Sequence, residues 1–255
     1  MSDPILEVKN VTKTFRERGG RRFTALDDVS LAVGEGECVG VVGESGCGKS
    51  TLARVITRLI LPDSGSVRFC GTEMTEVRGS QLRRAYRDMK MIFQEPRSSF
   101  DPRLTIGTSI RDALRPVVSG KKEQNAEIAH LLHAVGLEER YADAYPRQMS
   151  GGECQRAAIA RAIAQRPRLL ICDEATSALD VSVQAQVVEL LNTIRRETGI
   201  SYLFISHDLA LVRSFCDRTY VLYGGCVAEH GPTSQIIREP REEYTKRLLA
   251  SVLTI

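Results

Sequence analysis

The sequence predicts an α/β fold with a mostly parallel sheet and an inserted block of helices. Over residues 167–235, short apolar strands alternate with segments of helical periodicity, which is typical of parallel strands joined by helices. From about residue 105 to residue 166 the pattern is helical alone, and Ile128, Leu131 and Val135 recur on one helix face. The helical block therefore separates two α/β parts of the chain.

The individual elements follow from the same patterns. The run from residue 38 to residue 42 is apolar throughout, as expected of a strand that is buried on both faces. We expect strands near residues 6–11, 30–33, 38–42, 67–69, 89–93, 169–172, 202–205 and 220–222. We expect helices over residues 52–59, within 105–166, and over 183–194 and 209–215.

The composition is that of an ordinary folded protein. The 255 residues can bury a sizeable core, and 42% are apolar and 26% charged. A net charge of +3 gives no reason to expect a nucleic-acid partner or an anionic membrane surface. Seven scattered cysteines without a Cys-x-x-Cys pair favour a reducing compartment over a disulfide framework or a metal cluster. We see no signal peptide and no apolar run near the roughly 20 residues that span a bilayer, so action at a membrane would require partners.

A glycine-rich loop follows the strand at residues 38–42. It matches the phosphate-binding pattern G-x-x-x-x-G-K-[ST] and reads Gly43-Glu44-Ser45-Gly46-Cys47-Gly48-Lys49-Ser50. Its glycines let backbone N–H groups turn toward phosphate oxygens, and the following helix adds its positive end. Lys49 would contact the β- and γ-phosphates, and Ser50 would bind Mg²⁺. We therefore predict a nucleotide site of the P-loop NTPase kind, with Thr51 among its contacts.

Two carboxylates end the strand at residues 169–172. In parallel sheets, ligands bind at strand ends of this kind. Asp173 is placed to hold Mg²⁺, directly or through water. Glu174 could polarise the water that attacks the γ-phosphate. The alternative is a strand that only exits into a charged loop, and the phosphate loop upstream argues against it.

One segment narrows the class of NTPase. It reads Met149-Ser150-Gly151-Gly152-Glu153-Cys154-Gln155-Arg156 and resembles the signature motif of ABC ATPases. Ser150 with Glu153 is also a capping box that would begin a helix. Both interpretations can hold, because a capped helix start with two glycines exposes donors that bind an anion. The resemblance implies that Ser150, Gly151 and Gly152 complete the ATP site of the opposite subunit.

Other motifs resemble those of the same family in the same order. Gln94 resembles the Q-loop glutamine, which contacts Mg²⁺ and the attacking water and senses the transmembrane partner. Ser177-Ala178-Leu179-Asp180 resembles the D-loop, and His207 resembles the switch histidine that contacts the γ-phosphate. Phe15 stands where the family places an aromatic ring on adenine. The alternative for Phe15 is an ordinary core residue of a strand.

Three positions depart from the family's usual residues. Met149 replaces Leu, Glu153 replaces Gln, and Cys172 replaces a bulkier aliphatic residue. None of these changes removes a catalytic group, so we expect a site that is competent in hydrolysis.

The resemblance covers about residues 5–250 and implies a fold. It is a P-loop NTPase (RecA-like) core with an antiparallel β subdomain and an inserted α-helical subdomain. One ABC ATPase domain over residues 1–255 would divide into the β subdomain with the first part of the core (1–93), the helical signature subdomain (94–166), the second part of the core (167–235) and a C-terminal helical tail (236–255).

Two segments indicate a subgroup. Residues 94–103 and the tail at residues 243–249 resemble those of ATPases from oligopeptide, dipeptide and nickel importers. This implies ATP and Mg²⁺, an identical or paralogous ATPase partner, two transmembrane permease subunits and, indirectly, an extracytoplasmic solute-binding protein. The chain would then be a peripheral protein at the cytoplasmic face of the cell membrane. His130 and His133 are interpreted as an exposed helix face, since no third metal ligand is evident.

The resemblance also implies a mechanism in which two subunits sandwich two ATP molecules. Glu174 would activate water, Gln94 would assist it, and Lys49 and His207 would stabilise charge on the γ-phosphoryl group. ATP favours the closed dimer because it binds that state better. The alternatives are an export or division-associated ABC ATPase, a non-transport ABC ATPase, and a regulatory module that has lost hydrolysis. The intact Glu174 argues against the last.

Overall fold

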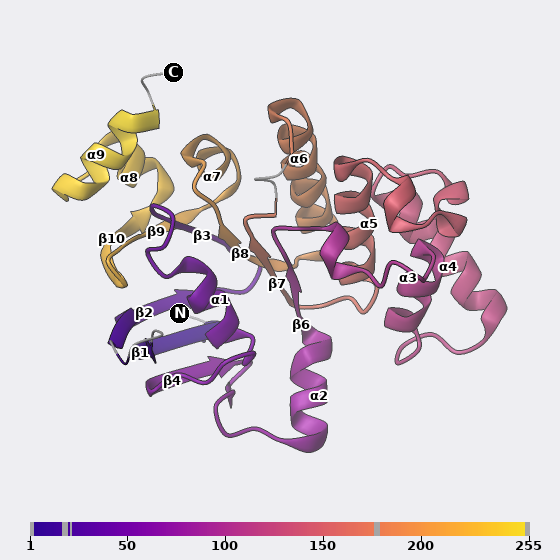
Figure 1. Ribbon diagram of the computed structural model, residues 1–255, viewed down its shortest axis with the longest axis horizontal. Helices are drawn as coiled ribbons and strands as arrows, with labels where there is room; N and C mark the ends of the chain where they lie inside the picture. The colour runs from indigo at the N-terminus through magenta and orange to yellow at the C-terminus, as the bar shows by residue number, and fades with distance from the viewer. Residues whose placement is uncertain (1–2, 17–19, 21, 176–178, 253–255) are drawn as a thin grey trace.

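The computed structural model describes residues 3–16, 20, 22–175 and 179–252, and its strands form two sheets (Figure 1). The first sheet is antiparallel and has the order β2-β1-β4-β5. Its strands are β1 (Leu6–Arg16), β2 (Arg22–Val33), β4 (Ser64–Phe69) and β5 (Thr72–Glu73).

The second sheet has the order β10-β9-β3-β8-β7-β6 and is parallel except for β10, which runs antiparallel to β9. Its strands are β3 (Cys38–Val42), β6 (Met89–Ile92), β7 (Leu169–Asp173), β8 (Ser201–Ile205), β9 (Arg218–Tyr223) and β10 (Cys226–Pro232). Later strands add on both sides of β3. The strand order therefore reverses at β3, and ligands of parallel α/β sheets bind at such a point.

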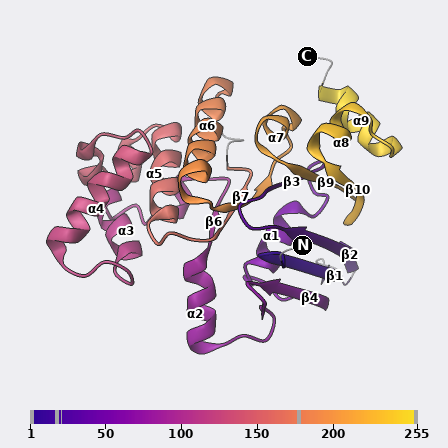
Figure 2. The same ribbon diagram turned by 180° about the vertical axis from the view of Figure 1, so that it is seen from behind.

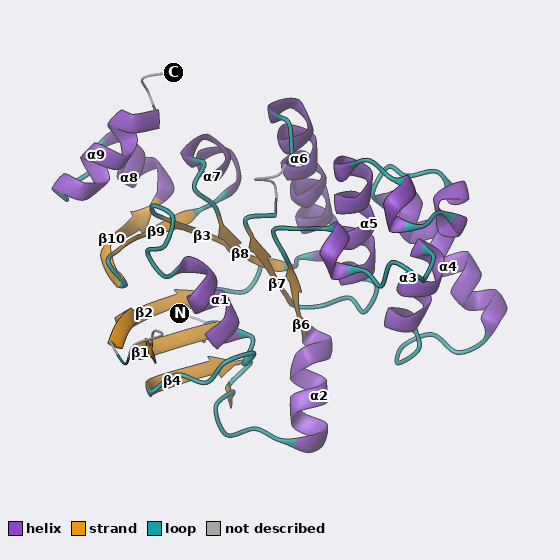
Figure 3. Cartoon of the chain, viewed as in Figure 1, coloured by secondary structure: helices purple, strands orange, loops and turns teal. Residues whose placement is uncertain are grey.

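Helices lie at both ends of the parallel sheet as well as against its faces. The insert lies beyond the β6 edge and α8 and α9 lie at the β10 edge, as both views show (Figures 1 and 2). The insert contains α3 (Ile106–Leu114), α4 (Lys121–Ala134), α5 (Gly151–Ile163) and the short 3₁₀ turns Arg97–Ser99, Glu139–Asp143 and Pro146–Gln148. The other helices are α1 (Lys49–Ile56), α2 (Gly79–Asp88), α6 (Val181–Thr198), α7 (Leu209–Phe215), α8 (Thr233–Arg238) and α9 (Glu243–Val252) (Figure 3).

Strand β3 separates two hydrophobic cores. Val39 and Val41 pack into the core that β3 shares with the antiparallel sheet and α1. Cys38 and Val42 pack into the core on the side of the insert and α7. Successive side chains of a strand point to opposite faces, so burial on both faces explains the continuous apolar run.

The structure agrees with the predicted fold and corrects its details. The expected helix over residues 52–59 was wrong at its end: α1 stops at Ile56, and Leu59 lies beyond it with 57% of its surface exposed. The physical reason is Arg58, which takes a left-handed backbone conformation (φ 56°) that ends a helix. Helix α2 and strand β10 were not expected, and no described helix is long and apolar enough to cross a bilayer. The division into residues 1–93, 94–166, 167–235 and 236–255 stays a prediction.

Candidate nucleotide-binding site

The carboxyl ends of four neighbouring strands supply the predicted catalytic residues. The phosphate loop follows β3, Gln94 follows β6, Asp173 and Glu174 end β7, and His207 follows β8. These strands are adjacent and parallel, in the order β3-β8-β7-β6. Parallel strands place their carboxyl ends at one edge of the sheet, so residues up to about 160 positions apart meet there.

The phosphate loop depends on glycine at its last turn before α1. Gly48 is the N-cap of α1 and has a φ of 108°, which side-chain-bearing residues rarely adopt. A Cβ atom at this position would lie 2.3 Å from the carbonyl oxygen of Ala25. The strand-to-helix turn can therefore form only because this residue has no side chain.

Lys49 lies inside the loop. Its ammonium group donates hydrogen bonds to the carbonyl oxygens of Gly43 (2.7 Å) and Glu44 (2.8 Å), and its side chain is 4% exposed. Its Nζ atom is 3.9 Å from Oε1 of Glu174. The lysine charge is thus held inside the loop that is predicted to bind the phosphates, on a flexible stem that can move.

Ser50 and Asp173 form a pair of oxygen ligands. The Ser50 hydroxyl donates to Oδ1 of Asp173 at 3.1 Å. Burial raises the pKa of Asp173, and the neighbouring charge of Glu174 raises it too, while the Ser50 hydrogen bond opposes the shift. A divalent cation would offset this cost of burying the carboxylate. A hydroxyl and a carboxylate are donors that Mg²⁺ prefers, so the pair fits that ion.

Glu174 is surrounded by the other predicted catalytic groups. Its Oε2 atom accepts a hydrogen bond from Gln94 Nε2 at 2.9 Å, and its Oε1 atom lies 3.8 Å from His207 Nδ1. The backbone at Glu174 is left-handed (φ 49°), and its N–H donates to the carbonyl of Ile205 at 2.9 Å. This conformation is strained for a residue that carries a side chain. The Glu174 carboxylate faces the phosphate loop, since its Oε1 atom lies 3.9 Å from Lys49 Nζ.

Lys49, Ser50, Gln94 and Glu174 line a cavity of about 340 Å³, whereas Asp173 and His207 are not among its lining residues. Its lining residues are Phe23, Ala25, Ser45, Gly46, Gly48, Lys49, Ser50, Thr51, Gln94 and Glu174. Phe15, the residue expected to stack on adenine, is not among them. With 39% of its surface exposed, Phe15 is not a core residue either.

Phe23 was not predicted from the sequence as a residue of this site. This residue pairs directly with Phe15 across β1 and β2, so both rings lie on the same face of the sheet. Phe23 is exposed at the cavity and is as well placed as Phe15 to contact a base. The signal available in the sequence was a second phenylalanine eight positions after Phe15.

The signature segment begins α5 and lies apart from the cavity. Ser150 Oγ accepts from the Glu153 N–H (3.2 Å), and Glu153 Oε2 accepts from the Ser150 N–H (2.7 Å), so the predicted capping box is confirmed. A Cβ atom on Gly152 would lie 2.8 Å from Val183 of α6, which explains the glycine there. Ser150 is exposed, and no residue of 149–152 lines the cavity of its own chain.

The remaining predicted residues lie outside the cavity. Asp180 is exposed at the N-cap position of α6, while Ser177 and Ala178 of the same motif lie outside the described residues. His130 and His133 are both exposed on α4. Within the described ranges, no three His, Cys, Asp or Glu side chains are grouped so that they could hold a metal ion.

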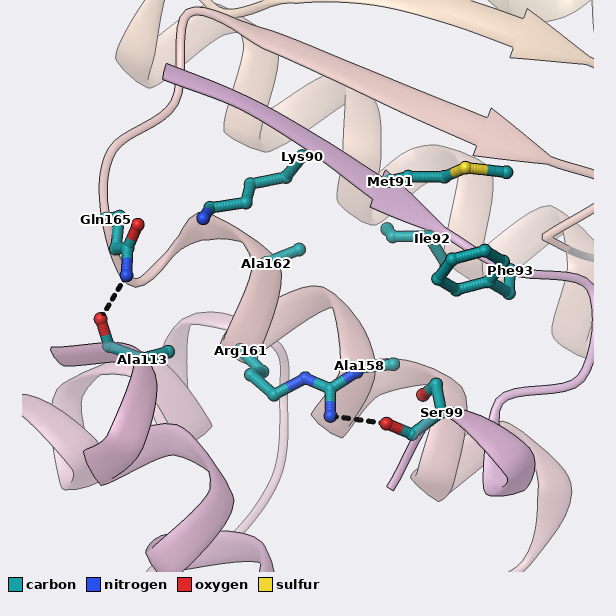
Figure 4. Close-up of a pocket in the computed structure, with 10 residues that line it drawn as sticks. All are labelled: Lys90, Met91, Ile92, Phe93, Ser99, Ala113, Ala158, Arg161, Ala162 and Gln165. Carbon is teal, nitrogen blue, oxygen red and sulfur yellow. Dashed lines mark hydrogen bonds between the residues drawn. The ribbon is translucent and has the colours of Figure 1, made fainter. Parts of the chain in front are cut away.

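A second cavity, of about 270 Å³, lies between β6 and the insert (Figure 4). Arg161 donates to the carbonyl of Ser99 (2.7 Å), and its guanidinium lies 4.2 Å from the ring centre of Phe100. Gln165 donates to the carbonyl of Ala113 (2.5 Å). Burial lowers the pKa of both Lys90 and Arg161. The β6 groove, as we call it, therefore carries two partly desolvated cations.

Comparison with known proteins gives one family. The family model described as "ABC transporter" matches residues 26–177. The chain is 46% identical to a probable peptide ABC transporter ATP-binding protein, y4tS, of Sinorhizobium fredii, and the match covers 98% of this chain and 73% of that protein. It is 42% identical to the glutathione import ATP-binding protein GsiA of Pectobacterium atrosepticum, over 98% of this chain and 41% of that protein. The chain thus spans less than half of the latter relative.

Solved structures agree with this result. The dimeric post-hydrolysis structure of the ATP-binding cassette MJ0796, bound to ADP and phosphate, matches with a TM-score of 0.80 and 32% identity over 89% of this chain and 98% of that chain. The family model covers more than half of the sequence, and y4tS resembles nearly all of it. The chain therefore belongs to the ABC transporter family, as an ATP-binding protein.

Proposed function

We propose that the chain is the ATP-binding and ATP-hydrolysing subunit of an importer that moves peptides, nickel or a related small solute across the cytoplasmic membrane. The observation that carries this proposal is that Lys49, Gln94 and His207 all lie within 4 Å of the Glu174 carboxylate, beside the Ser50–Asp173 pair. Two relatives support the choice of solute, since one is named for peptide transport and the other for import of glutathione, itself a tripeptide.

Each group has a role in this proposal. The loop amides and Lys49 bind the phosphates, and Ser50 and Asp173 would hold Mg²⁺, whose charge offsets that of the phosphates. Glu174 accepts a proton from the attacking water, and the Gln94 amide orients the Glu174 carboxylate. His207 is positioned to donate to the γ-phosphate from the side of β8.

The proposed working unit is a dimer with the ATP between two chains. Ser150 is exposed and does not line the cavity of its own chain, which leaves it free to face a partner. The partner is a second ATPase subunit, identical or paralogous. At the membrane the dimer would bind two permeases, which a solute-binding protein loads from the other side.

The direct test is reconstitution. The chain would be expressed with the permease subunits of the same transporter and placed in vesicles with the solute-binding protein. We expect ATP hydrolysis that depends on peptide-loaded binding protein, with uptake of the peptide. Export of solute, or ATP hydrolysis at the same rate with and without the binding protein, would contradict the proposal that the transporter is an importer.

A substitution at Ser150 tests the composite site separately from folding. Ser150→Asp keeps a good N-cap acceptor for α5 but adds a negative charge where the partner's γ-phosphate would lie. Like charges in contact across an interface cost several kcal/mol, so we expect ATP-driven dimerisation and hydrolysis to fall on the order of 10²-fold. Light scattering with ATP and a phosphate-release assay would measure both.

The matched control for this variant is Ser150→Asn, which also caps helices but carries no charge. We expect it to lose much less activity than Ser150→Asp, and both variants to keep the thermal stability of the wild type. Equal activity of Ser150→Asp and the wild type would show that the signature segment is not part of the ATP site.

The β6 groove is the proposed contact for a permease. Its cations Lys90 and Arg161 fit a segment that brings a carboxylate. Lys90→Glu should therefore weaken capture of the permeases about 10-fold or more, because it replaces attraction with repulsion. The control is Lys122→Glu, the same charge reversal at an exposed site on α4. Equal capture of the permeases by both variants would show that the β6 groove is not their contact.

A further inference from the structure

The C-terminal helix α9 contacts the phosphate loop. Tyr244 Oη accepts a hydrogen bond from the backbone N–H of Glu44 at 3.1 Å, across 200 positions of sequence. The tyrosine is 7% exposed, and its ring centre lies 4.1 Å from that of Tyr223 at the end of β9. This contact joins the tail to the loop that receives the phosphates.

The contact fixes one peptide unit from both sides. The C=O of Gly43 and the N–H of Glu44 belong to the same planar group and point in opposite directions. The carbonyl accepts from Lys49 Nζ at 2.7 Å, and the N–H donates to Tyr244. Rotation of this peptide would therefore break a bond to the catalytic lysine and a bond to α9 together.

This peptide needs such a support. Gly43 has a φ of 154°, and a Cβ atom there would lie 2.3 Å from the carbonyl oxygen of Leu222. The position therefore requires glycine, and glycine leaves the following peptide the most freedom to rotate. When ATP binds, Lys49 must turn from the loop carbonyls to the phosphates. Tyr244 then remains to hold the peptide.

The tyrosine itself is held in place. Glu229 of β10 accepts hydrogen bonds from the N–H groups of Arg241 (2.9 Å) and Glu242 (3.1 Å), which fixes the start of α9. Thr245, next to Tyr244, is 1% exposed. The hydroxyl of Tyr244 is thus presented by an anchored helix rather than by a free tail.

We propose that Tyr244 is a positioning residue for ATP binding, which acts by fixing the peptide between Gly43 and Glu44. This proposal rests on the nucleotide site described above. A hydrogen bond of this kind contributes a factor of about 2 to 10 in an equilibrium constant. We expect the effect on nucleotide affinity, because the hydroxyl of Tyr244 contacts the backbone of the phosphate loop.

The test compares two substitutions that each remove one hydroxyl from neighbouring rings. Tyr244→Phe should raise the Kd for ATP and for ADP by the same factor, about 2-fold to 10-fold, and leave kcat at saturating ATP unchanged. Tyr223→Phe should change neither. Titration calorimetry and a phosphate-release assay on the full chain measure these values, and thermal unfolding confirms that both variants are folded.

The outcomes test the role of Tyr244 and the existence of the nucleotide site separately. Wild-type affinity in Tyr244→Phe, or an equal loss in Tyr223→Phe, would overturn the role of Tyr244 while the nucleotide site stands. A fall in kcat without a change in Kd would also overturn it. Failure of the wild-type chain to bind ATP at all would instead overturn the nucleotide site on which the proposal rests.

Discussion

Glu174→Gln is expected to bind ATP and to hydrolyse it 10²-fold to 10⁴-fold more slowly, on the order of the contribution of a general base. The glutamine has the same shape and keeps an oxygen that can accept from Gln94, which bonds the carboxylate at 2.9 Å. It has no basic oxygen to take a proton from water. Binding, which depends on the loop and Lys49, should be nearly unaffected.

The same variant should accumulate as a closed dimer. ATP holds the two chains together until it is cleaved, so slow cleavage leaves the ATP-bound state populated. Size-exclusion chromatography with ATP and Mg²⁺ should show this dimer, and phosphate release in a single turnover should show the slow step. The control is Glu95→Gln, which removes an exposed carboxylate outside the cavity. Unchanged phosphate release from Glu174→Gln would refute the assignment of Glu174.

The loop, the acidic pair and the helix cap could be predicted because each lies within a short stretch of sequence. The pattern of residues 43–50 lies directly between an apolar strand and a helical repeat. Ser150 and Glu153 are only three positions apart. Glu174 directly follows an apolar strand, so its place at the strand end was evident. That Gln94 and His207 share its site was implied only by family resemblance, since their proximity depends on the strand order.

The residues that the sequence analysis missed act through distant contacts. Phe23 reaches the cavity because β2 pairs with β1 in a register that places it opposite Phe15. Tyr244 lies on an amphipathic helix, where a tyrosine is an ordinary core residue, and only the packing of α9 brings it to Glu44. Nothing in the local sequence specifies either contact.

Helix α2 and strand β10 were not predicted for a related reason. Helix α2 has only Ala85 as a buried residue among those described, so its apolar periodicity is too weak to predict a helix. Strand β10 has no fully buried residue and alternates weakly. Both elements form through their neighbours, β6 for α2 and β9 for β10, rather than through a pattern of their own.

Lys49→Ala is expected to act on binding rather than on the chemical step. The lysine now donates to two loop carbonyls and would donate to two phosphates when ATP is bound. Hydrogen bonds to charged groups contribute about 1.5–3 kcal/mol each, so the loss of two should weaken ATP affinity by about 10²-fold or more.

Titration calorimetry with ATP would measure this loss, with Lys122→Ala on α4 as the control for removing an exposed lysine. Lys49→Arg should not restore affinity, because the planar guanidinium is larger than the ammonium that fits this nearly closed space. The three variants around the phosphate loop then separate three roles. Glu174→Gln would change the rate, Tyr244→Phe would change affinity slightly, and Lys49→Ala would change affinity greatly. Full ATP affinity in Lys49→Ala would show that the phosphates bind elsewhere, and the assignment of the cavity would fail with it.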